Sequence, residues 1–194
     1  MHVENPNLFV ISGGPGAGKT TLLDELAKLG FRYAPEVARQ IIQEQVRTGG
    51  TALPWADRAA YIGLMLQRSI ESFEEHTPAP GPLFADRGIP DTLAYARVIG
   101  LANTRAIEDA CRRYRYASVV FLAPPWREIY RTDSERKQDF AEGERTYGGL
   151  WETYEECGYR LIELPKLEPI ARARFVCEHL ELAPPNAARH EAQS

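Results

Sequence analysis

One eight-residue segment, Gly-Gly-Pro-Gly-Ala-Gly-Lys-Thr at positions 13–20, constrains this chain more than any other part of it. It matches the G-x-x-x-x-G-K-[ST] loop, in which backbone N–H groups converge on a polyphosphate, the lysine reaches the outer phosphates and the hydroxyl coordinates Mg²⁺. The apolar run 8–11 precedes the loop and leucines at helical spacing follow it, which is the strand–loop–helix context that the motif requires. The alternative, a glycine-rich turn with a stray lysine, does not explain these flanks. The predicted phosphate-binding residues are Gly13, Gly14, Pro15, Gly16, Ala17, Gly18, Lys19, Thr20 and Thr21.

Length and composition favour a globular protein. The 194 residues, 44% of them hydrophobic, suit a single domain with a substantial core, which we place at residues 1–182. Residues 183–194 are polar and contain alanine and proline, so we predict a disordered tail.

Charge, cysteine usage and hydropathy bear on partners and compartment. The net charge of −4 gives no general attraction for nucleic acid or an anionic membrane, so we expect neither as a partner. The chain has no run of eighteen apolar residues, and its N-terminus lacks the basic and apolar segments of a signal peptide. Cys111, Cys157 and Cys177 are far apart in the sequence and have no metal-ligand spacing, which favours small buried thiols in a cytoplasmic protein.

Strand and helix patterns alternate along the chain. Such alternation predicts an α/β fold in which helices cover both faces of a parallel sheet. The predicted strands are residues 7–12, 31–33, 83–85, 118–122 and 160–164, and the predicted helices are residues 19–28, 38–48, 55–76, 92–99, 105–114, 126–131, 145–157 and 169–182. Ligands of such sheets bind beyond the carboxyl ends of the strands, so the residues after each strand are the functional candidates.

Glu36 follows the second predicted strand and is expected at the mouth of the sheet, next to the loop strand in folds of this kind. A carboxylate at this place could accept the proton of an acceptor hydroxyl that attacks a terminal phosphate. The alternative is a first-turn residue that the helix dipole favours.

The third predicted strand is followed directly by Asp86-Arg87-Gly88. An acidic residue directly after a buried strand could organise Mg²⁺, and the neighbouring arginine could contact phosphate. The alternative is a turn with an incidental ion pair. Asp91 directly precedes a helical pattern, so we interpret it as a helix N-cap.

A dense positive cluster follows the fourth predicted strand. Arg131, Arg136 and Lys137 lie in a segment, about residues 131–146, that could form a lid whose arginines neutralise a phosphoryl group in transit. Acidic residues alternate with them, so an ordinary salt-bridged helix is the alternative.

Aromatic residues mark two further helices. Trp55 and Tyr61 could border an acceptor pocket or belong to the core, whereas Trp151 and Tyr154 follow the apolar face of their helix and are interpreted as packing residues.

Four segments together, residues 9–21, 36–39, 86–88 and 133–136, carry a family resemblance. They resemble the P-loop family that includes the nicotinamide-ribose kinase domain of the bacterial NAD regulator NadR, whose members are often labelled AAA domain or ATPase. More distantly the chain is similar to thymidylate and deoxynucleoside kinases. The resemblance covers about residues 7–182 and implies a three-layer P-loop NTPase fold, with a five-stranded parallel sheet and a short helical lid. The chain shows no second helical domain and no hexamer-type arginine finger, so we do not expect a ring-forming motor.

The resemblance implies roles for the loop and for the last predicted strand. Gly13, Gly18, Lys19 and Thr20 would bind the phosphates of ATP and Mg²⁺, and residues 165–168 lie where related kinases hold the adenine ring.

It also implies roles around the acceptor. Glu36 resembles the general base of nucleoside kinases, and Asp86 with Arg87 resembles the acidic–arginine pair that follows the third strand in these enzymes. Arg131 and Arg136 fall where they have lid arginines.

The primary hypothesis is therefore an ATP- and Mg²⁺-dependent kinase for a small-molecule acceptor that is nucleoside- or nucleotide-like. Glu36 is the preferred base and Asp86 the preferred Mg²⁺ organiser, with Thr20 as the other metal residue, although the two carboxylates could exchange roles. The alternative is a regulatory binding module or slow NTPase whose lid orders when ATP or GTP binds. The absence of an Asn-Lys-x-Asp motif argues against GTP specificity. The sequence identifies neither the acceptor nor the oligomeric state.

Overall fold

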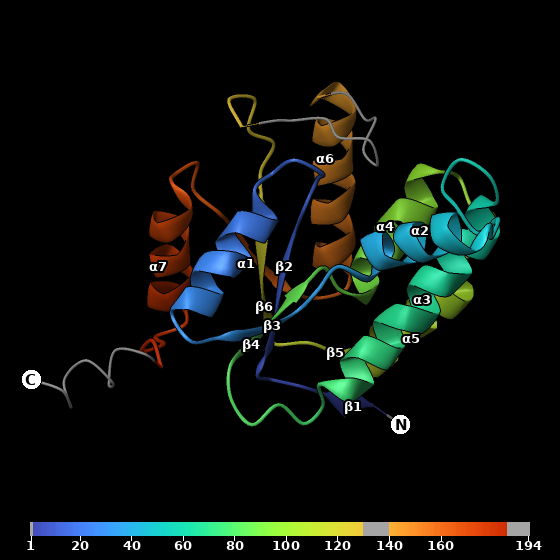
Figure 1. Ribbon diagram of the computed structural model, residues 1–194. Helices are drawn as coiled ribbons and strands as arrows, with labels where there is room; N and C mark the ends of the chain where they lie inside the picture. The colour runs from blue at the N-terminus through green and yellow to red at the C-terminus, as the bar shows by residue number, and fades with distance from the viewer. Residues whose placement is uncertain (1, 130–139, 186–194) are drawn as a thin grey trace, which may run out of the picture.

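A twisted parallel sheet forms the centre of the molecule (Figure 1). The computed structural model describes residues 2–129 and 140–185. The sheet has the strand order β3-β4-β2-β6-β7, and every neighbouring pair is parallel. Its strands are β2 (Leu8–Gly13), β3 (Arg32–Ala34), β4 (Leu83–Asp86), β6 (Val119–Ala123) and β7 (Arg160–Glu163). All five predicted strands are thereby confirmed, each to within one residue at either end. The expected position of the second one next to the loop strand is wrong, because β4 pairs with both and lies between β3 and β2.

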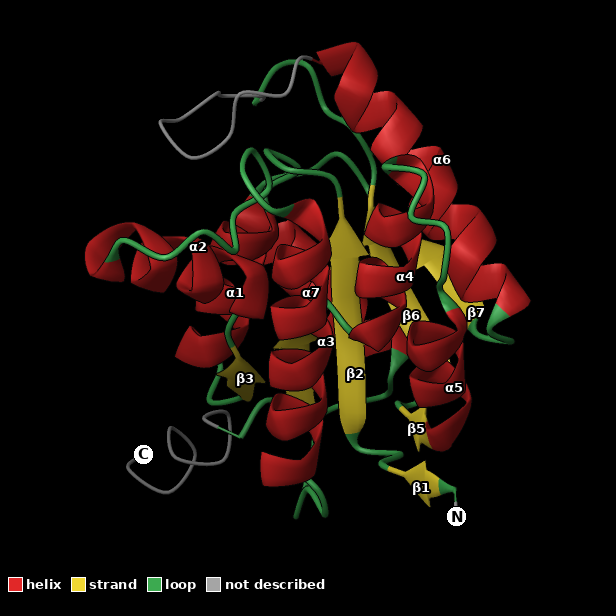
Figure 2. Ribbon diagram, turned by 90° about the vertical axis from the view of Figure 1, so that its right-hand side faces the viewer, coloured by secondary structure: helices red, strands yellow, loops and turns green. Residues whose placement is uncertain are grey.

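Helices cover both faces of this sheet (Figures 1 and 2). They are α1 (Lys19–Lys28), α2 (Val37–Thr48), α3 (Arg58–Glu75), α4 (Ile89–Val98), α5 (Arg105–Arg113), α6 (Phe140–Glu156) and α7 (Pro169–His179). Side chains of α1 and α7 form the core on one face, and those of α3 to α6 form the core on the other. Along β2, Leu8 and Val10 belong to the second of these cores and Ile11 to the first, because successive side chains of a strand point to opposite faces. The predicted three-layer α/β fold is confirmed.

Several helix boundaries differ from the prediction. The helix predicted at 126–131 is wrong over its described part, since residues 127–129 form a turn. Helix α3 begins at Arg58 because the carboxylate of Asp57 accepts a hydrogen bond from the backbone N–H of Ala60 (3.0 Å). Helix α4 begins at Ile89, three residues earlier than predicted, and α6 at Phe140, five residues earlier.

A second, two-stranded parallel sheet was not predicted. Strands β1 (Val3–Glu4) and β5 (Tyr114–Arg115) pair with each other and lie below the main sheet in the view of Figure 2. Two-residue strands are too short to carry a periodic pattern, so no signal in the sequence distinguishes them from loop.

Some predictions fall on residues that the structure does not describe. The segment 130–139, with Arg131, Arg136 and Lys137, lies outside the described residues, and so does the tail from 186 onwards. The rest of the predicted lid, residues 140–146, belongs to α6.

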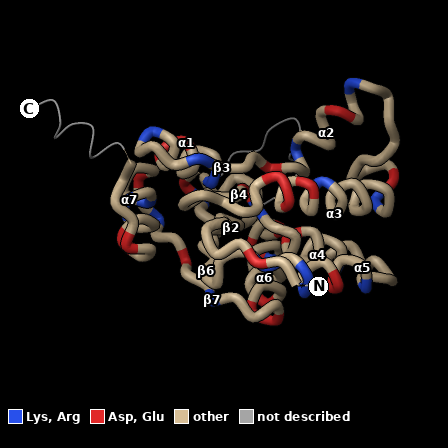
Figure 3. The backbone as a smooth tube through the Cα atoms, turned by 90° about the horizontal axis from the view of Figure 1, so that it is seen from below, with Lys and Arg blue, Asp and Glu red and all other residues tan. Residues whose placement is uncertain are grey.

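The described part of the chain contains no helix that could cross a membrane. Basic and acidic residues are interspersed on the outer helices (Figure 3). Cys111 and Cys177 are buried and Cys157 is half-buried, in agreement with the predicted internal thiols.

Candidate functional site

The phosphate-binding loop connects β2 to α1 at the carboxyl end of the sheet. Gly13, Gly16 and Gly18 have positive φ angles of 139°, 74° and 77°, a backbone conformation that other residues adopt only with strain. Gly18 is also the N-cap of α1, so the positive end of the helix dipole faces the loop. The loop therefore has the backbone shape and the field that an anion requires.

Gly13 is required for a second reason, the close approach of β6. A Cβ atom at this position would lie 2.5 Å from the carbonyl oxygen of Ala123. We expect Gly13→Ala to lower the free energy of unfolding by about 3 kcal/mol, because it adds a backbone clash to an unfavourable φ angle. Chemical denaturation measures this change. The matched control is Gly63→Ala in α3, where nothing lies within 4 Å; it should stabilise the protein by about 0.5–1 kcal/mol, and equal effects at the two sites would contradict the argument.

The Lys19 side chain lies within the loop. It is only 4% exposed, and its ammonium group donates hydrogen bonds to the carbonyl oxygens of Gly13 (3.1 Å) and Gly14 (3.2 Å). The ammonium group is thus held inside the loop whose sequence motif predicts phosphate binding.

Asp86 ends β4, opposite Ile11 of the loop strand. Its carboxylate is buried, and Oδ1 has no hydrogen-bond partner among the described residues. Burial raises the pKa of Asp86, whereas the positive charges of Lys19 and Arg87 oppose that rise. An unpartnered buried oxygen next to the loop lysine fits a role in holding Mg²⁺ or its water.

The metal itself would depend on the nucleotide. Among the described residues, no group of three histidine, cysteine or acidic side chains could hold a metal ion. Mg²⁺ is typically held by one or two protein oxygens together with phosphates and water. Thr20, in the first turn of α1, and Asp86 are the residues that suit this arrangement.

Arg87 connects two carboxylates. Its Nε donates to Glu36 (2.8 Å) and its Nη1 donates to Asp91 (3.0 Å). Burial lowers the pKa of Arg87, but the negative charges of Glu36, Asp91 and Asp86 outweigh it, so that the pKa lies above its ordinary value. The backbone of Arg87 has φ = 76°, which is rare for a residue other than glycine and is often found at functional sites.

Glu36 is the N-cap residue of α2, yet its side chain makes no capping hydrogen bond. The carboxylate pairs instead with Arg87 and is largely buried there. The first-turn interpretation of Glu36 is therefore the weaker one, because the side chain points into the cluster and not to the helix amides.

Asp91 is a functional candidate that the sequence prediction missed. It is the third residue of α4 and not the N-cap, which is Gly88, so the N-cap prediction is wrong. Its two oxygens accept hydrogen bonds from the Ser12 hydroxyl (2.6 Å), the Arg87 guanidinium, the Gly88 N–H (2.8 Å) and the Tyr154 hydroxyl (2.5 Å). The sequence did contain one signal for Asp91: an acidic residue three positions after the N-cap can accept a hydrogen bond from the N-cap N–H.

The aromatic residues separate into different environments. The Tyr154 ring packs in the core as predicted, but its hydroxyl bonds to Asp91, and burial raises the pKa of Tyr154 well above its ordinary value. Trp151 packs against the same core, as predicted. Tyr61 is buried between α2 and α3, whereas Trp55 is 59% exposed and is not a core residue.

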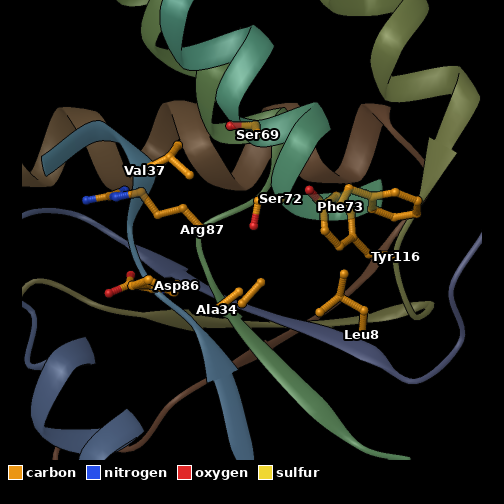
Figure 4. A pocket seen from close by; sticks show the side chains of 11 residues that line it. Leu8, Ala34, Val37, Ser69, Ser72, Phe73, Asp86, Arg87 and Tyr116 are labelled. Carbon is orange, nitrogen blue, oxygen red and sulfur yellow. The ribbon is translucent and has the colours of Figure 1, made fainter. Parts of the chain in front are cut away.

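A small cavity lies between α3 and the ends of β3 and β4 (Figure 4). Its volume is about 20 Å³, which suits roughly one water molecule. It is lined by Leu8, Ala34, Pro35, Val37, Ser69, Ser72, Phe73, Ala85, Asp86, Arg87 and Tyr116. A nucleoside cannot enter this volume.

The site consists of a strand, a glycine loop and a helix, with an acidic–arginine pair at the end of the neighbouring strand. These features define a P-loop protein with the fold of the small P-loop kinases. The family model described as AAA domain (AAA_28) matches residues 8–172, and the chain belongs to this family.

Known structures and sequences agree with this assignment. The fold is similar to that of the NadR protein solved in complex with NR, with a TM-score of 0.70, 19% identity and coverage of 92% of this chain and 52% of that chain. It is also similar to thymidylate kinase from Ehrlichia chaffeensis, with a TM-score of 0.60, 18% identity and coverage of 92% and 100%. A nucleotide-binding protein of Ruegeria sp. (strain TM1040) is 29% identical over 112 residues, which are 58% of this chain and 36% of that protein. This chain thus matches only part of that relative and about half of NadR. The predicted resemblance to P-loop kinases is confirmed.

Proposed function

We propose that this protein transfers the terminal phosphoryl group of ATP to the hydroxyl of a small-molecule acceptor. The observation that carries the proposal is the cluster of Glu36, Asp86 and Arg87 next to the buried ammonium group of Lys19. The fold shared with P-loop kinases supports it. Phosphoryl transfer needs mainly positioning and neutralisation of charge, and these residue types supply both.

The donor side is the P-loop. Its backbone N–H groups and the start of α1 would bind the β- and γ-phosphates, and Lys19 would move from its carbonyl partners to the phosphate oxygens. Mg²⁺, when bound, would neutralise phosphate charge, and Thr20 and Asp86 would hold it. Arg131 and Arg136 remain proposed lid residues.

On the acceptor side, Glu36 is the proposed general base. It would take the proton of the acceptor hydroxyl as the new O–P bond forms and the bond to ADP breaks. Protonation of Glu36 removes one of the two charges that hold Arg87, so the Nε side of the guanidinium could then turn to the oxygens of the transferred group. Asp86 suits this role less well, because it is more deeply buried and is the residue proposed to hold Mg²⁺.

The charge of the cluster favours an acceptor without a phosphate group. Glu36, Asp86 and Asp91 contribute three carboxylates, and two of them already share Arg87. Lys19 and Arg87 offset two of these three charges and leave a formal charge of −1, which favours a neutral or cationic hydroxyl compound, such as a nucleoside, over an acceptor that brings a further phosphate. We therefore propose a nucleoside-like acceptor over a nucleotide.

The test is Glu36→Gln, assayed with γ-labelled ATP against a panel of nucleosides, nucleotides and sugars. Loss of the base should reduce transfer at least tenfold, while calorimetry should show unchanged ATP affinity. The control is Glu44→Gln on the same helix, whose exposed carboxylate pairs with Arg68 at the surface; its transfer rate should equal that of the wild type. Unchanged turnover of Glu36→Gln would end the base assignment. If label appears only as inorganic phosphate with every acceptor, the protein is instead a nucleotide-dependent binding module.

A further inference from the structure

A buried arginine lies behind the P-loop. Arg172, on α7, is only 2% exposed. Its Nη1 donates to the carbonyl oxygen of Ala17 (3.0 Å) and lies 3.5 Å from that of Gly18. Helix α7 packs beside α1 (Figure 1), so Arg172 reaches the loop from the α7 side.

The charge of Arg172 has no counterion in the described residues. No carboxylate there lies within ion-pair distance, and the buried Nε has no hydrogen-bond partner. Burial alone lowers the pKa of Arg172 to about 10. A buried cation without a counterion is normally destabilising, so its presence at this place suggests that a ligand supplies the missing negative charge.

The two carbonyl contacts also fix the orientation of the loop. In a trans peptide the C=O and N–H bonds point in opposite directions. A carbonyl of Ala17 that faces Arg172 therefore turns the N–H of Gly18 away from α7, towards the interior of the loop. A Cβ atom on Gly18 would lie 2.8 Å from Nη1, so glycine at this position permits the contact.

We propose that Arg172 is a positioning residue for the polyphosphate of the nucleotide, which aligns the loop amides from behind and supplies a positive charge that the phosphates neutralise. This inference rests on the proposed nucleotide binding. Both effects act on phosphates and neither acts on the base or on the acceptor. Loss of Arg172 should therefore weaken the binding of ATP and ADP without destabilising the fold.

The test is Arg172→Met, which keeps the length and apolar contacts of the side chain but removes its charge. Calorimetry with Mg²⁺ and ATP or ADP should show a dissociation constant at least tenfold higher than in the wild type. Thermal unfolding without nucleotide should give a Tm equal to or higher than that of the wild type. A residue that only stabilised the fold would produce the opposite pattern, a lower Tm with unchanged affinity.

Two further variants complete the experiment. Arg172→Lys keeps the charge but loses the planar fork, so its affinity should lie between those of the wild type and Arg172→Met. Arg174→Met, two residues further along α7 on its exposed side, is the matched control and should bind like the wild type. The inference is overturned if Arg172→Met binds ATP as the wild type does, or if it melts lower or fails to fold. A wild-type protein that does not bind ATP would overturn the proposed function itself, which is a distinguishable result.

Discussion

Lys19→Ala is expected to abolish the binding of ATP at millimolar concentration. The ammonium group is the only loop side chain with a full positive charge, and a charge-assisted contact with the outer phosphates cannot be replaced by water at equal strength. We expect the dissociation constant to rise at least a hundredfold, or about 3 kcal/mol. Titration calorimetry with Mg²⁺ and ATP measures the change directly.

The control for Lys19 lies on the same helix. Lys28, in the last turn of α1, is exposed and pairs with Glu25 at the surface. Lys28→Ala should leave ATP affinity unchanged and alter the free energy of unfolding by less than about 0.5 kcal/mol. If Lys19→Ala bound ATP as tightly as Lys28→Ala, the P-loop would not be the nucleotide site.

Asp91→Ala is expected to lower the free energy of unfolding by about 3–5 kcal/mol. The substitution leaves the hydroxyls of Ser12 and Tyr154 and the Gly88 N–H without their buried acceptor. It also removes one of the two carboxylates that hold Arg87. Urea denaturation, followed by far-ultraviolet circular dichroism, measures the loss.

Two variants show whether the effect comes from the network. Tyr154→Phe removes one donor of the four and should cost about 1–2 kcal/mol. Asp109→Ala, on the exposed face of α5, breaks only a surface pair with Arg112 and should change stability by less than about 0.5 kcal/mol. A value for Asp91→Ala within 1 kcal/mol of that for Asp109→Ala would mean that the buried hydrogen bonds contribute little.

The parts of the site that the sequence predicted are local in the chain. The P-loop, with Gly13, Gly18 and Lys19, is one continuous segment, and its residue types predict its backbone conformation and its phosphate-binding groups. Asp86 and Glu36 could be found because each lies within three residues of the end of a strand pattern, and parallel strands bring their carboxyl ends to the same edge of the sheet. The strands themselves were predictable because buried parallel strands are short apolar runs between turn residues.

The parts that the sequence did not predict depend on contacts between distant residues. Tyr154 bonds to Asp91 across 63 positions of the chain, and Arg172 bonds to Ala17 across 155. The sequence pattern correctly assigned Tyr154 to the apolar face of its helix and placed Arg172 within a helix. It does not predict which polar atom a buried hydroxyl or guanidinium contacts. The same limit explains Trp55, which is aromatic but exposed.

The sequence by itself determined the phosphate-binding loop, the order of strands and helices and the edge of the sheet where chemistry could occur, because these follow from backbone sterics and side-chain periodicity over a few residues. Only the tertiary structure decided that Arg87 joins Glu36 to Asp91, that Asp91 organises four donors, and that a cation lies behind the loop. Hydrogen bonds and charges act over a few ångströms in space, and the distance between residues along a chain does not give the distance between their atoms.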